Sequence, residues 1–334
     1  MASTRPLIII TGAAGFIGSA IAWRLNQDGR DNLLLVDQLG GGSKWRNLVP
    51  LGYWDYMEKM EFLAAVQSGK FNEVEIESII HMGACSSTTQ MDASYLEKNN
   101  FEYTKILAAF CLERPKPIRF IYASSAATYG DGKQGYRDDQ ALLSSLRPLN
   151  AYGFSKHMFD LWAQKRGYLD QIVGLKFFNV YGPNEYHKND MCSMALKAFE
   201  QIQQTGRVRL FKSHRTDYGD GEQLRDFIYV KDAVDMALHF LDPKVPGGIY
   251  NLGTGQTRSW LDMTRTLFHA MGKEPKVDFI PMPELIRDKY QYHTRAEISK
   301  LRAVGYSNPI RTLEEGIADY VTYLEKGFLN LGWA

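Results

Sequence analysis

The chain has 334 residues, of which 45% are hydrophobic and 23% are charged, a composition typical of globular proteins with one large or two medium domains. Its formal net charge at pH 7 is +1, so charge gives no reason to expect a nucleic-acid partner or an anionic membrane surface. No apolar run approaches the roughly 20 residues that a membrane-spanning helix needs. The three cysteines lack any CxxC or metal-ligand spacing, which predicts no metal site and a reducing, cytoplasmic location.

A buried strand is predicted at Leu7–Thr11, because the run LIIIT is apolar and rich in β-branched residues. It leads into Gly12, Gly15 and Gly18, then into an amphipathic helix and a second apolar strand that ends at Asp37. In such a unit the glycines let the backbone approach a pyrophosphate, and the helix N-terminus offers free N–H groups to the phosphates. The pattern therefore predicts dinucleotide binding.

The residues after this unit leave the choice of dinucleotide open. Asp37 favours NAD, because a carboxylate accepts hydrogen bonds from the adenosine ribose and repels a 2′-phosphate. Lys44, Arg46 and Lys59 follow, and their positive charges would neutralise the 2′-phosphate of NADP.

Further strands are predicted at 76–81 and 118–122, with a helical segment from 102 to 113 between them. Alternating strands and helices predict an α/β fold with a doubly wound parallel sheet, or Rossmann fold. Ligands bind at the carboxyl ends of the strands in such sheets. Ser125 lies just past one of these ends.

The stretch NAYGFSK places Tyr152 and Lys156 four residues apart, on one face of a predicted helix. Beside a nicotinamide, Ser125 would bind the oxygen of an alcohol substrate and Tyr152 would remove its proton. Lys156 would hold the nicotinamide ribose. Together with the charge of an oxidised nicotinamide, it would also lower the pKa of Tyr152 from about 10.

Beyond Asn179 the alternation weakens. Helices are predicted at 191–204, 230–241, 260–271 and 312–324, with strands at 208–211 and 226–230 and a strand followed by a turn at 247–255. We expect a dinucleotide-binding Rossmann domain formed by residues 1–178 and 226–252. A smaller α/β substrate-binding domain formed by 179–225 and 253–334 would interleave with it, and the active site would lie in the cleft between them.

Longer motifs are more specific. They are HMGACSSTT at 81–89, YASSAATYG at 122–130, LNAYGFSK at 149–156, FFNVYGP at 177–183 with His187 and Lys188 after it, and RDFIYV at 225–230. In order and spacing they resemble the ADP-L-glycero-D-manno-heptose 6-epimerase family, which belongs to the extended short-chain dehydrogenases/reductases of the NAD-dependent epimerase/dehydratase superfamily. The resemblance runs over nearly the whole chain.

The resemblance implies an isomerase that inverts C6 of ADP-D-glycero-D-manno-heptose, a precursor of the lipopolysaccharide inner core. The reaction would pass through a 6-keto intermediate that is re-reduced with bound NADP. Tyr152 and Lys188 would be the two acid/base groups, and Lys188 would need a lowered pKa. The resemblance also implies a homo-oligomer, a pentamer.

The resemblance also assigns binding residues. Besides the three glycines, it assigns to the cofactor Phe16, Ile17, Asp37, Gln38, Lys44, Lys59, Asn99, Tyr152 and Lys156. With Ser125, it assigns to the substrate Asn179, Lys188, Lys197, Phe211, Lys212, Ser213, His214, Arg225 and Tyr290. Lys44 and Lys59 move the expectation toward NADP. Arg225 would clamp the diphosphate, and a structural ion pair with a neighbouring acid is the alternative.

The chain departs from the family pattern in four places. Met82 replaces a Glu, Gln38 an Asn and Lys197 a His, and the segment 215–223 is longer and more acidic than usual. These departures affect the expected details of substrate recognition rather than the expected chemistry.

Three other functions compete with this one. A UDP-hexose 4-epimerase using NAD is favoured by Asp37 and opposed by Lys188. A nucleotide-sugar 4,6-dehydratase is not expected, since alanines follow Ser125 where that class has an Asp-Glu pair. A non-catalytic dinucleotide sensor need not keep the phenol of Tyr152 or the ammonium of Lys156.

Overall fold

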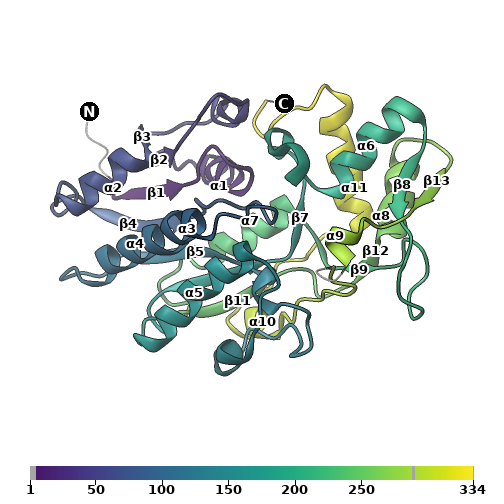
Figure 1. Cartoon of the computed structure of the whole chain (residues 1–334). Helices are drawn as coiled ribbons and strands as arrows, with labels where there is room; N and C mark the ends of the chain where they lie inside the picture. Colours follow the sequence, from purple (N-terminus) through teal and green to yellow (C-terminus); the bar gives the residue numbers. More distant parts are fainter. Residues whose placement is uncertain (1–4, 288–289, 334) are drawn as a thin grey trace.

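The computed structural model describes residues 5–287 and 290–333. Its centre is a seven-stranded sheet in the order β11-β6-β5-β4-β1-β2-β3, in which all neighbouring strands are parallel (Figure 1). The strands are β1 (Leu7–Thr11), β2 (Leu33–Asp37), β3 (Asp55–Glu58), β4 (Ile76–His81), β5 (Arg119–Ser125), β6 (Val173–Phe177) and β11 (Gly248–Leu252). The predicted doubly wound α/β fold is confirmed.

Helices cover both faces of this sheet. Side chains alternate between the faces along each strand, so Ile8 and Ile10 of β1 belong to one hydrophobic core and Ile9 to the other. The first core contains α1 (Phe16–Gln27) and α7 (Val230–His239). The second contains α2 (Lys59–Gln67), α4 (Tyr103–Leu112) and α5 (Ala151–Lys165).

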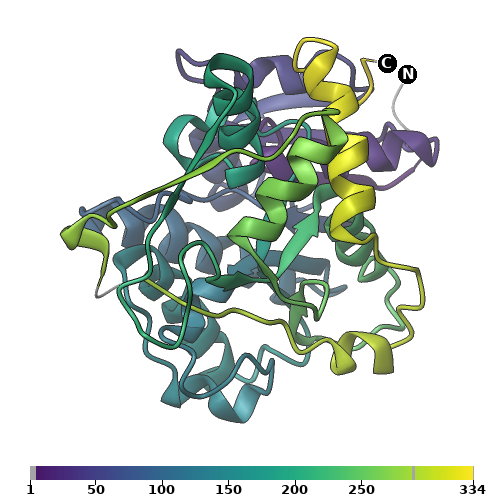
Figure 2. The ribbon, with the colours of Figure 1, turned by 90° about the vertical axis from the view of Figure 1, so that its right-hand side faces the viewer.

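The rest of the chain forms smaller sheets and three further long helices. β7 (Asn179–Tyr181) pairs with β10 (Phe227–Tyr229), β8 (Val208–Phe211) with β13 (Val277–Ile280), and β9 (Leu224–Arg225) with β12 (Arg258–Ser259). Around them lie α6 (Met194–Thr205), α8 (Trp260–Ala270) and α11 (Leu313–Glu325), and Figure 2 shows α8 beside α11. The division into two interleaved domains stays a prediction.

Short elements complete the described chain. They are α3 (Ala93–Leu96), α9 (Glu284–Arg287), α10 (Ser299–Ala303), the π-helix η2 (Glu97–Glu102), and the 3₁₀ turns η1 (Lys44–Leu48), η3 (Ala126–Tyr129), η4 (Gln140–Ser145) and η5 (Tyr186–Met191). In the part of the chain that the structure covers, no helix combines the length and apolarity needed to cross a membrane.

Some helices and strands begin or end at other residues than the sequence predicted. The helix predicted from residue 191 begins at Met194, because Ser193 caps it by accepting a hydrogen bond from the backbone N–H of Leu196. The predicted helix at 102–113 starts as α4 at Tyr103, since the π-helix η2 precedes it. The strand predicted at 118–122 runs three residues further and ends at Ser125.

The strand order reverses at β1, which lies between β4 and β2. The turns after β1 and β4 touch there: Gly12 has a φ of +68°, and a β-carbon on it would lie 2.6 Å from the backbone nitrogen of Gly83. Only glycine permits this approach. A crevice at such a switch point is where open α/β sheets bind ligands.

Candidate active site

A cavity of 470 Å³ lies at the carboxyl ends of β1, β2 and β4. The predicted cofactor residues that line it are Gly12, Gly15, Phe16, Ile17, Gly18, Asp37, Gln38, Lys44, Lys59 and Asn99. Met82, at the position where the family has Glu, lines it too. The structure therefore brings together residues from the glycine-rich turn, the end of β2 and the helices beyond β3.

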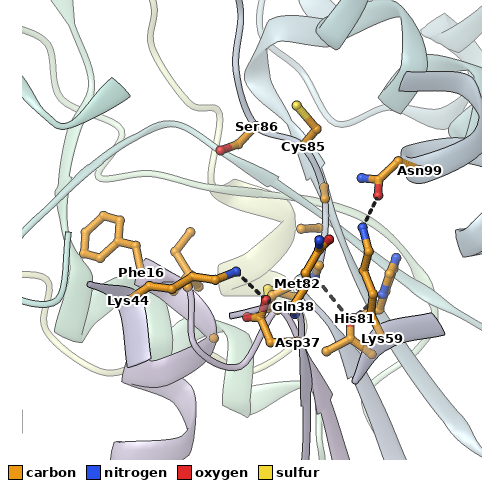
Figure 3. A pocket seen from close by; sticks show the side chains of 18 of the residues that line it. Phe16, Asp37, Gln38, Lys44, Lys59, His81, Met82, Cys85, Ser86 and Asn99 are labelled. Atoms are coloured by element: carbon orange, nitrogen blue, oxygen red, sulfur yellow. Dashed lines mark hydrogen bonds and ion pairs between the residues drawn. The ribbon is translucent and has the colours of Figure 1, made fainter. Parts of the chain in front are cut away.

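Asp37 is tied to the glycine-rich turn and to a lysine. Its Oδ2 accepts a hydrogen bond from the backbone N–H of Ala14 at 2.8 Å. Its Oδ1 accepts from the N–H of Gln38 at 2.6 Å and from the Lys44 ammonium at 2.6 Å. Figure 3 shows Lys44 directed at Asp37 and Lys59 directed at Asn99. The Lys59 ammonium donates to Oδ1 of Asn99 at 2.9 Å. One negative and two positive side chains thus share this end of the cavity.

A chain of hydrogen bonds through His81 fixes the cavity floor. Thr104 donates to the carbonyl of Asn100 at 2.6 Å, so its oxygen is left to accept from Nε2–H of His81 at 2.9 Å. Nδ1 of His81 then accepts from Thr11 at 2.6 Å, and Thr11 accepts from the N–H of Gly83 at 3.2 Å. Burial lowers the pKa of His81 to about 3, which keeps the ring neutral.

A second cavity, of 680 Å³, adjoins the first. Phe16, Ile17, Ser86, Lys188 and Met191 line both cavities. The larger cavity also takes in Ser125 and Tyr152, and its remaining wall is mostly apolar and aromatic. Of the candidate catalytic groups, Lys188 lines both cavities, Ser125 and Tyr152 line the larger one, and Lys156 lines neither.

Ser125, Tyr152 and Lys156 come together between β5 and α5. Ser125 and Tyr152 line the same cavity. Burial raises the pKa of Tyr152, and the neighbouring Ser125 side chain opposes the rise. The sequence predicted a lowered pKa for Tyr152 beside Lys156 and an oxidised nicotinamide; within the protein itself the direction is the opposite, because the phenol is buried. The Lys156 ammonium donates to the carbonyl of Ala123 at 2.7 Å. Burial lowers the pKa of Lys156 to about 8.

A buried ion pair lies one turn further along α5. The Lys176 ammonium is 2.9 Å from Oδ2 of Asp160, and both side chains are almost fully excluded from solvent. Asp160 also accepts hydrogen bonds from Tyr122 at 2.9 Å and Ser124 at 2.8 Å, and Lys176 donates to Thr128 as well. A buried pair with such further bonds is well satisfied. It fastens α5 to the strand that carries Ser125.

Lys188 lies on η5, outside the large sheet. Its ammonium is 5.3 Å from the centre of the Phe16 ring. Burial lowers the pKa of Lys188, and the nearby Glu185 carboxylate opposes this. The direction agrees with the expectation from the sequence. A partly desolvated lysine of this kind can exchange a proton with a bound hydroxyl more readily than an exposed one.

Arg225 is 6% exposed and stacks between aromatic rings. Its guanidinium carbon is 5.5 Å from the centre of the Trp260 ring and 5.1 Å from that of Tyr290, and both rings line the larger cavity. No carboxylate within residues 5–287 and 290–333 forms an ion pair with Arg225. The alternative role of Arg225, a structural ion pair with a neighbouring acid, is therefore absent within that range. The positive charge of Arg225 stays available to an anionic ligand.

The predicted substrate residues separate into two groups. Ser125, Asn179, Lys188, Lys197, Phe211 and Tyr290 line the larger cavity, whereas Lys212, Ser213, His214 and Arg225 do not. His214 instead packs on Tyr292 and hydrogen-bonds its hydroxyl at 2.8 Å. Lys197 donates to the carbonyl of Asp190 at 2.6 Å. Substrate contacts by these residues stay predictions.

Sequence reasoning missed several lining residues. Trp260 and Met263 of α8 carry no motif signal, and they enter the larger cavity because α8 packs beside α6. His187 lines the cofactor cavity. It stands next to Lys188 in the quoted motif, so its position could have been inferred there.

The first cavity suits a nicotinamide dinucleotide. Its wall combines the free N–H groups at the start of α1 with a carboxylate and two lysines, and it adjoins the cavity that holds Ser125 and Tyr152. A β-carbon at Gly18 would lie 2.2 Å from the carbonyl oxygen of Gly12, so the tight turn that presents these N–H groups requires glycine.

Residues 8–253 match the sequence profile of the NAD dependent epimerase/dehydratase family. Since this range spans most of the chain, the chain belongs to that family.

Individual relatives are more specific. The chain is 49% identical over 315 residues to ADP-L-glycero-D-manno-heptose-6-epimerase of Nitratidesulfovibrio vulgaris strain DP4, which covers 94% of this chain and 97% of that protein. The crystal structure of the Helicobacter pylori ADP-L-glycero-D-manno-heptose-6-epimerase is similar with a TM-score of 0.77 and 27% identity over 96% of each chain. That of the Thermus thermophilus UDP-glucose 4-epimerase complex with NAD is similar with a TM-score of 0.75 and 26% identity, over 96% of this chain and 99% of that one. The resemblance inferred from the motifs is confirmed.

Proposed function

We propose that the protein is an isomerase that converts ADP-D-glycero-D-manno-heptose to ADP-L-glycero-D-manno-heptose by inverting C6 of the heptose, a step in lipopolysaccharide inner-core precursor synthesis. The observation that carries the proposal is that Tyr152 and Lys188, from two separate elements, line one cavity next to the dinucleotide-binding turn. The relative that is 49% identical over nearly the full length supports this substrate.

The chain's residues would divide the work as follows. A nicotinamide dinucleotide held in the first cavity would supply the hydride acceptor and, later, the hydride donor for C6. Ser125 and Tyr152 hold the C6 hydroxyl on one side, and one of the two acid/base groups removes its proton as the C6–H bond breaks. After the ketone has turned, the other group gives a proton to the oxygen as the new C6–H bond forms. Lys156 would orient the nicotinamide ribose.

We further propose that the cofactor is NADP, with NAD as the alternative. Lys44 and Lys59 line the cofactor cavity beside Asp37, and Lys44 already compensates that carboxylate at 2.6 Å. A 2′-phosphate would therefore meet two ammonium groups and a partly neutralised acid. Dissociation constants of the cofactor-free protein for NADP and NAD test this choice, and equal values would contradict it.

A cytoplasmic homo-oligomer, a pentamer by resemblance, is proposed as well. The segment 45–54 exposes Trp45, Val49, Tyr53 and Trp54, each between 42% and 54%. An exposed apolar patch of this kind suits a subunit contact. Analytical ultracentrifugation tests the proposal, and a monomer at micromolar concentration would contradict it.

The function itself is tested by NMR. Purified protein with NADP and no added reductant is incubated with ADP-D-glycero-D-manno-heptose. We expect the L-glycero epimer to accumulate to equilibrium without net NADPH. Conversion of UDP-glucose to UDP-galactose in its place would favour the UDP-hexose 4-epimerase, and turnover of neither substrate would overturn the proposal.

A further inference from the structure

The segment 184–191, which carries Lys188, has an unusual backbone. Asn184 and Asn189 have φ values of +79° and +47°, although neither is glycine. Such conformations are uncommon and persist only when the surroundings hold them. The position of Lys188 therefore depends on whatever fastens this segment.

One fastening is the carboxamide of Asn47, which is 3% exposed. Its Nδ2 donates to the carbonyl of Ala14 in the glycine-rich turn at 2.9 Å and to the carbonyl of Asn184 at 3.1 Å. It also lies 3.3 Å from Nδ1 of His187, the neighbour of Lys188. One side chain thus bridges the cofactor-binding turn and the part of the segment that directly precedes Lys188.

The side chain of Asn184 adds a second fastening to the same place. Its Nδ2 donates to the hydroxyl of Ser19 at 2.9 Å, and that hydroxyl donates to the carbonyl of Gly15 at 2.6 Å. Both contacts run to the first turn of α1. The segment therefore docks on the dinucleotide-binding turn, although it lies 137 residues from Asn47 along the chain.

The state of His187 fits this arrangement. The amide nitrogen of Asn47 has two hydrogens, which the carbonyls of Ala14 and Asn184 accept, so its contact with Nδ1 of His187 at 3.3 Å is the weakest of the three. Burial lowers the pKa of His187 to about 4, and the positive charges of Lys188 and Lys44 act in the same direction. A neutral ring preserves the contact with Asn47 at physiological pH.

We propose that Asn47 is a positioning residue for the second acid/base group: it fastens segment 184–191 to the dinucleotide-binding turn and so places Lys188 from the cofactor side. This inference rests on the proposed role of Lys188. Asn47 shares the single turn η1 with Lys44, which lines the cofactor cavity. One short element therefore serves both the cofactor and the base.

The first test is hydrogen exchange of the cofactor-free protein. Asn47→Asp keeps the shape of the side chain but replaces its donor with an acceptor that faces two carbonyls. We expect amide exchange in residues 184–193 to accelerate about tenfold or more, with little change in α5. Unchanged exchange there would overturn the inference. Asn47→Ser, which is shorter and uncharged, gives the same readout if the aspartate variant does not fold.

The matched control is Asn26→Asp. Asn26 also bridges two carbonyls, those of Arg30 and Gly52, at 2.9 and 2.8 Å, but its side chain forms no hydrogen bond with segment 184–191 in the described chain. It should leave exchange in residues 184–193 as in the parent protein. If both variants accelerate it equally, Asn47 has only a general structural role and the inference fails.

The second test follows single turnovers. Protein loaded with oxidised cofactor is mixed with either heptose epimer, and reduced nicotinamide is followed by absorbance. Hydride leaves C6 while the hydroxyl proton passes to Tyr152 for one epimer and to Lys188 for the other. We expect Asn47→Asp to slow the oxidation of only one of the two epimers, the one whose proton passes to Lys188, by about 10- to 100-fold. A small misplacement of a catalytic group lowers a rate by about that factor. Equal slowing of both would contradict the inference.

Lys188→Gln separates the two proposals. If it slows neither half-reaction, the proposed role of Lys188 fails, whatever exchange shows. If it slows one half-reaction and Asn47→Asp leaves that half-reaction unchanged, the role of Lys188 stands and the positioning role of Asn47 is wrong.

Discussion

The two cavities are built differently. The cofactor cavity lies on the ends of adjacent parallel strands, and its side chains are bonded to each other, as in the pairs Asp37–Lys44 and Lys59–Asn99. The larger cavity draws its wall from elements spread between residues 16 and 290, and much of that wall is apolar or aromatic. Against two of its wall residues, Trp260 and Tyr290, packs the buried guanidinium of Arg225, which forms no ion pair with a carboxylate in the described chain.

This difference teaches how each half of the site is specified. The cofactor half is held in place by its own hydrogen bonds, so single changes there should alter affinity more than architecture. In the substrate half, charges such as Arg225 and Lys188 are buried without full compensation, so they should contribute strongly once an anionic or hydroxylic ligand arrives.

The largest expected effect is at Tyr152, which lines the larger cavity. Tyr152→Phe removes the phenolic hydroxyl that would transfer the proton, and general acid–base catalysis contributes about 10²- to 10⁴-fold. We expect kcat for heptose epimerisation to fall by about that factor while cofactor binding changes little. Steady-state rates and cofactor titration measure the two effects. Tyr168→Phe, just beyond the end of α5, is the control and should turn over normally; normal turnover by Tyr152→Phe would refute the assignment.

A smaller effect is expected in the substrate half. Arg225→Met keeps the stem volume but removes the charge that would bind the diphosphate, and hydrogen bonds to charged groups contribute about 1.5–3 kcal/mol. We expect KM to rise about 10- to 100-fold. The control is Arg258→Met: Arg258 lies opposite Arg225 in the β9–β12 pair but is bonded to Glu314. Equal effects of the two variants would argue against a ligand role for Arg225.

A change in the cofactor half should act on selectivity. Lys44→Gln removes one ammonium and leaves Asp37 less compensated, so both changes disfavour a 2′-phosphate. We expect affinity for NADP to fall about tenfold and affinity for NAD to change less than about threefold. Isothermal titration measures both, with the exposed Lys133→Gln as control. A uniform loss for both dinucleotides would contradict the proposed NADP preference.

The smallest effect concerns pH and the cavity floor. Folded His81 has a pKa near 3, below its ordinary value of about 6.5, so only the unfolded chain takes up this proton as the pH falls through 6.5. The contribution of the neutral His81 ring to the free energy of unfolding is therefore fully present above about pH 6.5. It is lost as the pH falls toward 3, by up to about 1.4 kcal/mol for each pH unit. Between pH 6.5 and 5 the protein should lose about 1 to 2 kcal/mol through this ring.

Urea unfolding at several pH values measures this loss. His81→Gln should flatten the dependence on pH, although it lowers stability at neutral pH, whereas the exposed His269→Gln should leave the slope unchanged. A parent-like slope in His81→Gln would show that other groups govern acid unfolding.

Much of the cofactor half could be predicted from sequence because its signals are local. The apolar run Leu7–Thr11, the glycine spacing and Asp37 lie within one contiguous unit, and the structure forms it as β1, α1 and β2. The spacing of Tyr152 and Lys156 is likewise a property of one helix. The strand expected at Val208–Phe211 is β8 itself.

The rest depends on contacts between distant segments, which no local pattern reports. Neither the bridge from Asn47 to Asn184 nor the stacking of Arg225 on Trp260 leaves a periodic signal. The raised pKa of Tyr152 was also out of reach, since it follows from burial rather than from the neighbouring lysine.

The shared wall of the two cavities has a thermodynamic consequence. Phe16, Ile17, Ser86, Lys188 and Met191 face both, so an occupant of one cavity changes the surface that the other offers. Such coupling is reciprocal: if bound dinucleotide strengthens nucleotide-sugar binding by some factor, the sugar strengthens dinucleotide binding by the same factor. Each partner then retards the departure of the other, which suits a reaction whose hydride must be returned before anything leaves.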